Sequence, residues 1–157
     1  EQHTACCTGV RQARDIDAIA SQIIPTDDTP GAHEAGAVYF IDGALAGFFA
    51  AHRAEFLAHY GEFNAALAAK QADVRFADLA PERQIEFLKS VETTPFFEQV
   101  RFLTILGLLA LPGYGGNKDG IGWKLIGFDD QHVFEPPFGY YDRDYPGFVP
   151  YEPQAKS

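Results

Sequence analysis

Serine and basic residues are scarce in this sequence, and each scarcity argues against a class of function. The three serines, Ser21, Ser90 and Ser157, all lie outside the sharp glycine-flanked turn that a serine nucleophile needs. Lysine and arginine number 12 against 22 aspartates and glutamates, which gives a formal net charge of −10. Such a charge argues against nucleic acid or an anionic membrane as a partner and is typical of a soluble protein.

Cysteine is nearly absent, and the two that occur, Cys6 and Cys7, are adjacent. Neighbouring cysteines do not easily bridge each other, because the eight-membered ring strains the peptide between them. Two idle thiols, a disulfide to another chain and a metal site all remain open. The metal site is the weakest of these, because no further cysteine exists to complete it.

Long hydrophobic runs are also missing. The best window, residues 102–111, is ten residues long, about half of the length that a membrane-spanning helix requires. No basic and apolar leader opens the sequence, which leaves a mature exported chain and a cytoplasmic one as alternatives.

Helical periodicity dominates the first two thirds of the chain. The spacing of apolar residues and the positions of proline predict an all-α bundle of about five helices, with Asp15 and Asp17 near the start of the first helix and Asp28 or Thr29 capping the second. The last helix is apolar all round in its C-terminal half, so we expect it in the middle of the bundle. The expected helices cover residues 11–24, 32–49, 53–72 and 96–111, with a further helix that starts within residues 78–82 and runs to residue 91.

Periodicity stops after Leu111, where a glycine-rich loop begins. Five glycines lie between Gly113 and Gly122, a density that predicts positive φ angles or close backbone approach. The loop does not match a phosphate-binding loop or a dinucleotide fingerprint, because Lys118 stands where a third glycine would fall. We interpret the loop as a surface for a partner, with Tyr114, Gly115, Gly116, Asn117 and Trp123 as candidate interface residues. The alternative is that Tyr114 and Trp123 close the end of the bundle and the glycines serve turns.

Tyrosine and proline crowd the C-terminus without any helical or strand period. Such rings are common at interfaces, where one end of the ring stays wet. This predicts three parts: a flexible stub over 1–10, a helical domain with its loop over 11–128, and an extended arm over 129–157. The candidate anchors in the arm are Tyr140, Tyr141, Tyr145 and Phe148.

A metal site built on Glu55 and His59, four residues apart, with His33 from another helix, is the competing interpretation. It would make the chain an independent helical metalloenzyme. However, the sequence contains no Glu-x-x-His pair of the kind that di-iron bundles use. A surface pair at this spacing is common on helices. A free-standing binding module is a third possibility.

Several motifs together resemble the gluconate 2-dehydrogenase subunit 3 family, the small subunits of bacterial FAD-dependent sugar and sugar-acid dehydrogenases. The resemblance covers roughly residues 15–130. It rests on Ile23-Ile24-Pro25-Thr26-Asp27-Asp28, Pro30-Gly31-Ala32, Ala35-Gly36-Ala37-Val38, Phe40-Ile41-Asp42, Phe76-Ala77-Asp78-Leu79, Gly113-Tyr114-Gly115-Gly116-Asn117 and Gly122-Trp123-Lys124-Leu125-Ile126-Gly127-Phe128.

The resemblance implies a non-catalytic helical subunit without a cofactor or metal of its own. FAD would belong to a large partner subunit of the glucose-methanol-choline oxidoreductase type, and whether that subunit also holds an iron–sulfur cluster is left open. Haem c would belong to a multihaem cytochrome, where that third subunit is present. It also implies a periplasmic complex exported on a twin-arginine signal of the small subunit. This sequence contains no Arg-Arg pair, so the export role is an expectation. The sugar is not readable from this chain.

Overall fold

A computed structural model describes residues 9–130, and within that range it contains helices and no strand. The predicted all-α fold is therefore confirmed. The α-helices are α1 (Val10–Ile23), α2 (Ala37–Ala46), α3 (Arg53–Lys70), α4 (Pro81–Val91), α5 (Pro95–Leu109) and α6 (Ile121–Ile126). Short 3-10 turns are η1 (Ala50–His52), η2 (Phe76–Asp78), η3 (Pro112–Tyr114) and η4 (Lys118–Gly120). None of these helices is long and apolar enough to cross a bilayer.

Proline and threonine mark where the helices start and stop. Pro81 and Pro95 occupy the first positions of α4 and α5, where the missing N–H leaves no bond unmade and the fixed φ suits the helix. Thr94 caps α5, because its hydroxyl oxygen accepts a hydrogen bond from the Phe97 N–H at 3.4 Å. Pro25 follows the end of α1 as predicted.

The helix predicted over residues 32–49 is shorter than expected. Residues 32–36 form turns, and α2 begins after Gly36, whose φ of 69° lies in the left-handed region. The prediction that Asp28 or Thr29 caps this helix is therefore wrong. Asp27 instead accepts hydrogen bonds from the backbone N–H and the hydroxyl of Thr29, which closes a local turn.

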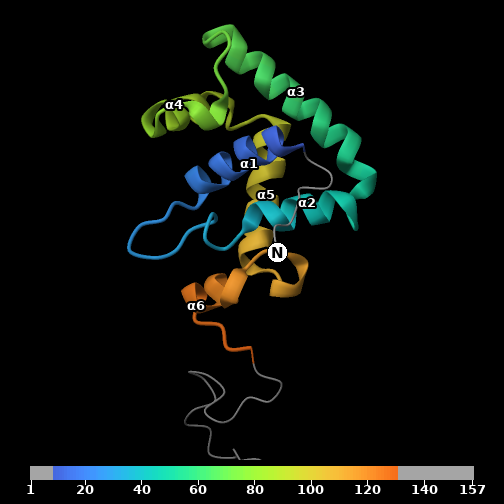
Figure 1. Cartoon of the computed structure of the whole chain (residues 1–157), viewed down its shortest axis with the longest axis vertical. Helices are drawn as coiled ribbons and strands as arrows, with labels where there is room; N and C mark the ends of the chain where they lie inside the picture. Colours follow the sequence, from blue (N-terminus) through green and yellow to red (C-terminus); the bar gives the residue numbers. More distant parts are fainter. Residues whose placement is uncertain (1–8, 131–157) are drawn as a thin grey trace, which may run out of the picture.

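Helix α5 runs through the middle of the molecule, as its apolar sequence predicted. Figure 1 shows it upright at the centre, behind α1 and α2, with α6 near its lower end. It packs against α1, α2, α3 and α6. One face is nevertheless open in the described structure: Phe102, Ile105 and Leu109 are 56%, 43% and 37% exposed. These residues recur at helical spacing, so they form a single apolar stripe.

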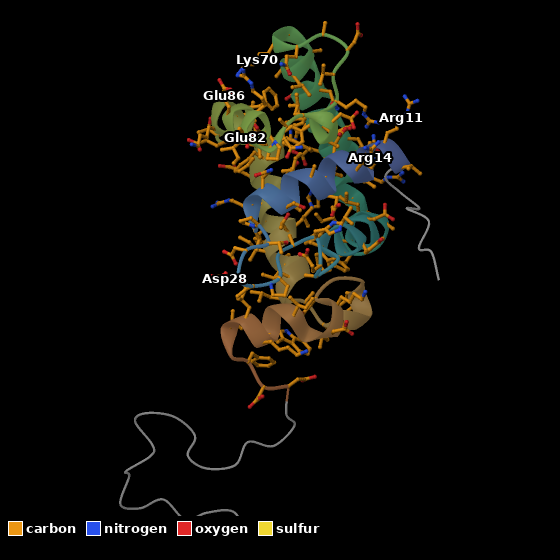
Figure 2. The ribbon with its side chains drawn as sticks, turned by 60° about the vertical axis from the view of Figure 1, so that its left-hand side comes forward. Arg11, Arg14, Asp28, Lys70, Glu82 and Glu86 are labelled. Carbon is orange, nitrogen blue, oxygen red and sulfur yellow. The ribbon has the colours of Figure 1, made fainter. Side chains whose placement is uncertain are left out.

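Phenylalanine rings fill the core between α3, α4 and α5. The ring centroid of Phe63 lies 5.5, 5.2 and 4.8 Å from those of Phe76, Phe87 and Phe96. Such tilted and edge-on pairs contribute beyond the area they bury. Arg11, Arg14, Lys70, Glu82 and Glu86 are exposed and lie at the outside of the molecule in Figure 2.

Candidate partner-binding surface

The glycine-rich loop caps the C-terminal end of α5. The last carbonyls of an α-helix have no partner within the helix, and here the loop supplies two. The Asn117 amide donates to the Ala110 carbonyl at 2.8 Å, and the Trp123 ring N–H donates to the Leu109 carbonyl at 2.9 Å. Trp123 belongs to α6, which begins at Ile121 directly after the loop.

Asn117 holds the loop together from inside. It is fully buried, its φ of 46° lies in the left-handed region, and its side-chain oxygen accepts a hydrogen bond from the Gly122 N–H at 2.8 Å. Asparagine tolerates this backbone conformation better than most residues. Asn117 is buried in this chain and positions neighbouring residues of the loop, while its contact with a partner stays a prediction.

Gly116 and Gly122 allow the loop to lie directly on α5. A Cβ at Gly116 would overlap the Gly107 carbonyl, and a Cβ at Gly122 would overlap the Leu108 carbonyl. Gly115 has a φ of 98°, so both features expected of this loop, positive φ and close backbone approach, are present. Close approach here is to the chain's own helix.

Several backbone N–H groups of the loop already donate hydrogen bonds within the chain. The N–H groups of Gly115, Lys118 and Gly120 donate to the carbonyls of Pro112, Ala35 and Asn117. A phosphate site needs several N–H groups that point together at the ligand. These three N–H groups are therefore not available to a phosphate in this conformation.

Tyr114 stands at the outer side of the loop and joins an aromatic surface. Its ring lies 6.2 Å from that of Phe48, which lies 4.9 Å from that of Phe49. Tyr114 and Phe48 are 56% and 59% exposed. Exposed large rings in contact with one another are characteristic of interaction sites.

An apolar pocket continues this surface between Phe49 and Phe102. Its volume is about 150 Å³, and its lining is Leu45, Phe49, His52, Phe56, Gln99, Phe102 and Leu103. Leu45, Phe56 and Leu103 are buried and form its floor. The two polar groups in the lining have partners: His52 lies 3.7 Å from Glu55, and Gln99 bonds to His59 at 3.1 Å.

A second, more polar groove of about 740 Å³ lies between the turns at residues 32–36 and the glycine-rich loop. Two acidic side chains in its lining, Asp17 and Glu34, already interact with other groups of this chain. Asp17 pairs with His33 at 2.8 Å. The Thr26 hydroxyl and then the Gly31 N–H donate to Glu34 and hold the pKa of its carboxyl below its usual value. These bonds fix the turn that precedes α2.

The residues of the metal hypothesis are not brought together. Glu55 lies beside His52, His59 bonds to Gln99, and His33 bonds to Asp17. Within residues 9–130 no group of three histidines, cysteines, aspartates or glutamates is arranged to hold a metal. The described structure gives that alternative no support.

The sequence interpretation placed Asp15 wrongly. It was expected near the helix start, where its charge would favour the helix dipole, but it is 1% exposed and accepts three hydrogen bonds. The Tyr60 hydroxyl, the Arg75 guanidinium and the Ala77 N–H lie at 2.6, 3.0 and 3.0 Å from its oxygens. The sequence did contain a signal for this burial: Asp15 stands four residues before the buried Ile19, and residues four apart lie on the same face of a helix.

Other expected residues lie outside the described part of the chain. The candidate anchors Tyr140, Tyr141, Tyr145 and Phe148, and the cysteines Cys6 and Cys7, fall beyond residues 9–130. Their roles stay predictions.

Comparison with protein families gives one match, over residues 11–130, to the family described as Gluconate 2-dehydrogenase subunit 3. The match includes every α-helix of the described structure and the glycine-rich loop, apart from the first residue of α1. Comparisons with curated proteins and with solved structures gave no match.

Proposed function

The chain belongs to the gluconate 2-dehydrogenase subunit 3 family, and from this we propose that it is the non-catalytic small subunit of an FAD-dependent dehydrogenase complex. In this proposal it binds and stabilises a large FAD-containing subunit that oxidises a sugar, a polyol or a sugar acid. FAD, with any iron–sulfur cluster, then belongs to that large subunit. Haem c belongs to a cytochrome subunit, if the complex contains one. The complex works in the periplasm, and this chain accompanies the folded flavoprotein during export.

The observation that carries the proposal is the family match, because it spans the whole described helical domain. The chemistry of the described side chains is compatible with it. Ser21 and Ser90 donate hydrogen bonds to the backbone carbonyls of Asp17 and Phe87, so both hydroxyls serve local structure. The exposed rings of Phe48, Phe102 and Tyr114 suit a protein surface better than a small polar substrate.

Affinity purification from cells that express the full set of subunits tests the proposal. Tagged full-length chain should recover a flavoprotein several times its own mass, and denaturing that material should release FAD. Recovery of the chain alone, or with metal bound at about one ion per chain, would contradict the proposal. Fractionating the cells and finding the complex in the cytoplasm would contradict the periplasmic part alone.

A further inference from the structure

The described surface of this chain carries a continuous apolar path from the glycine-rich loop to the open face of α5. The contacts run from Tyr114 to Phe48 and from Phe48 to Phe49. Phe49 and Phe102 then face each other across the 150 Å³ pocket. We call Tyr114, Phe48, Phe49 and Phe102, with this pocket, the aromatic patch. Phe48 and Phe49 belong to the turn that follows α2, and Phe102 belongs to the central helix α5, so the patch joins these two elements.

The area of the patch fits the centre of a protein interface. At 56–59% exposure, each of Phe48, Phe102 and Tyr114 leaves about 100 Å² of ring open. With Ile105 and Leu109 on the same face of α5, the open apolar area reaches about 400–500 Å². A standard interface takes about 800 Å² from each partner, so the patch supplies about half and polar surroundings can supply the rest.

The pocket has the properties of a site for one large apolar side chain. Its buried floor is Leu45, Phe56 and Leu103. An apolar cavity of about this size is known to accept a benzene-sized group and to stay dry without one. Pockets that receive an aromatic or branched side chain at the middle of an apolar surface carry most of the energy of many interfaces.

We propose that the FAD-containing catalytic subunit docks on the aromatic patch and inserts one large apolar side chain between Phe49 and Phe102. This rests on the proposed function, which supplies the partner, and adds the surface through which that partner binds. The glycine-rich loop then has an indirect role: its packing on α5 fixes Tyr114 at one end of the patch.

Substitution of the exposed rings in the full chain tests the surface. Phe102→Gln and Phe48→Gln should each lower the flavoprotein recovered with the tagged chain about tenfold or more. The matched control is Ile85→Gln, on exposed α4 surface away from the patch, and it should leave recovery within about twofold. Because all three side chains are exposed, the melting temperature of each isolated chain should change by less than about 2 °C.

Gln99→Phe tests the inserted side chain separately. Gln99 lines the pocket, so a ring at this position fills it while the exposed rings of the patch remain. Recovery should fall about tenfold although the surface has become more apolar. Unchanged recovery would overturn the insertion.

Salt distinguishes this surface from the polar groove beside Asp17 and Lys118. Apolar docking should change less than about twofold between low and high ionic strength, because screening acts on charges. A steep loss of flavoprotein with added salt would point to the groove and would overturn the proposal.

The remaining outcomes separate the two proposals. If unsubstituted chain recovers no flavoprotein, the proposed function and this surface both fail. If it recovers flavoprotein and the patch variants recover as much as Ile85→Gln, the surface fails and the proposed function stands. If Phe102→Gln lowers the melting temperature of the isolated chain, or removes a dimer of it, the patch is covered by this chain or by a second copy and the proposal is overturned.

Discussion

At the scale of single residues, Asp15 connects three parts of the chain that lie far apart in sequence. Its carboxylate accepts from Tyr60 on α3, from Arg75 and from the backbone of η2 at Ala77. Arg75 also donates to the Arg11 carbonyl at 2.7 Å, which ties the same segment to the start of α1. A buried carboxylate is tolerated where its oxygens are satisfied in this way.

We predict that Asp15→Asn destabilises the protein by about 3 kcal/mol. The substitution removes the negative charge that pairs with the Arg75 guanidinium, and it brings the amide NH2 group of asparagine next to the three groups that donate hydrogen bonds to Asp15. Urea unfolding of the isolated chain measures this change. Asp28→Asn, in an exposed turn, is the matched control and should stay within about 0.5 kcal/mol. Equal effects at the two positions would show that the Asp15 bonds contribute little.

Tyr60 gives the same network a dependence on alkaline pH. Burial raises the pKa of its hydroxyl above the usual value of 10.0, and the hydrogen bond to Asp15 raises it further. A raised pKa in the folded state contributes stability that is present below pH 10.0 and is lost as the pH rises through the folded pKa.

The expected result is that Tyr60→Phe is less stable than the parent at neutral pH, by about 1.5–3 kcal/mol for the lost bond to a carboxylate. The difference should shrink as the pH rises above 10.0. Urea unfolding of both proteins across this pH range measures it. A gap that stays constant with pH would contradict the assignment of the raised pKa to Tyr60.

At the scale of elements, the glycine-rich loop and the end of α5 form one unit. Asn117 and Trp123 bond to the carbonyls of Ala110 and Leu109, and the glycines let the two backbones touch. Asn117 and Trp123 therefore close the end of the bundle, as the alternative interpretation of the loop proposed for Trp123. Tyr114 is left facing outward, and presentation to a partner stays a proposal for that residue.

We predict that Gly116→Ala and Gly122→Ala each cost about 1–3 kcal/mol, because the new methyl group must push the loop away from α5 carbonyls. Gly113→Ala provides the control, since a Cβ there meets no atom within 4 Å. Thermal melting of the three variants compares them. If all three melt alike, the loop separates from α5 at little cost and the tight contact is unimportant.

At the scale of the whole molecule, the described helices form a core among themselves. The buried cluster includes side chains of α1, α2, α3, α4 and α5. Within residues 9–130 this core is complete enough to predict that the helical domain does not depend on the C-terminal arm.

Deleting residues 135–157 should therefore leave the helical circular dichroism of the chain nearly unchanged, while recovery of the flavoprotein falls because Tyr140, Tyr141, Tyr145 and Phe148 are gone. Loss of the helical signal on truncation would instead place those rings in this chain's own core. Unchanged recovery would remove the arm from the interface.

The sequence by itself determined the helices and the family. Periodicity of apolar residues and the fixed φ of proline act within a few residues, so α1, α3, α4 and α5 fall close to their predicted positions. The start of α2 was missed because the turn before it depends on bonds such as that from the Ala32 N–H to the Ile24 carbonyl, which periodicity does not report.

Tertiary structure alone decided the roles of Asp15, Asn117 and Phe102. The partners of Asp15 stand 45 to 62 positions away in sequence, so its hydrogen bonds became visible only when α1, α3 and η2 met. Asn117 was expected at a surface and lies inside, because the loop folds back on α5. Phe102 lies on the helix that we expected in the middle of the bundle, and yet its ring is partly open, because the described helices cover the other faces of α5 and leave this one uncovered. Burial is a property of which elements meet, and local sequence does not specify it.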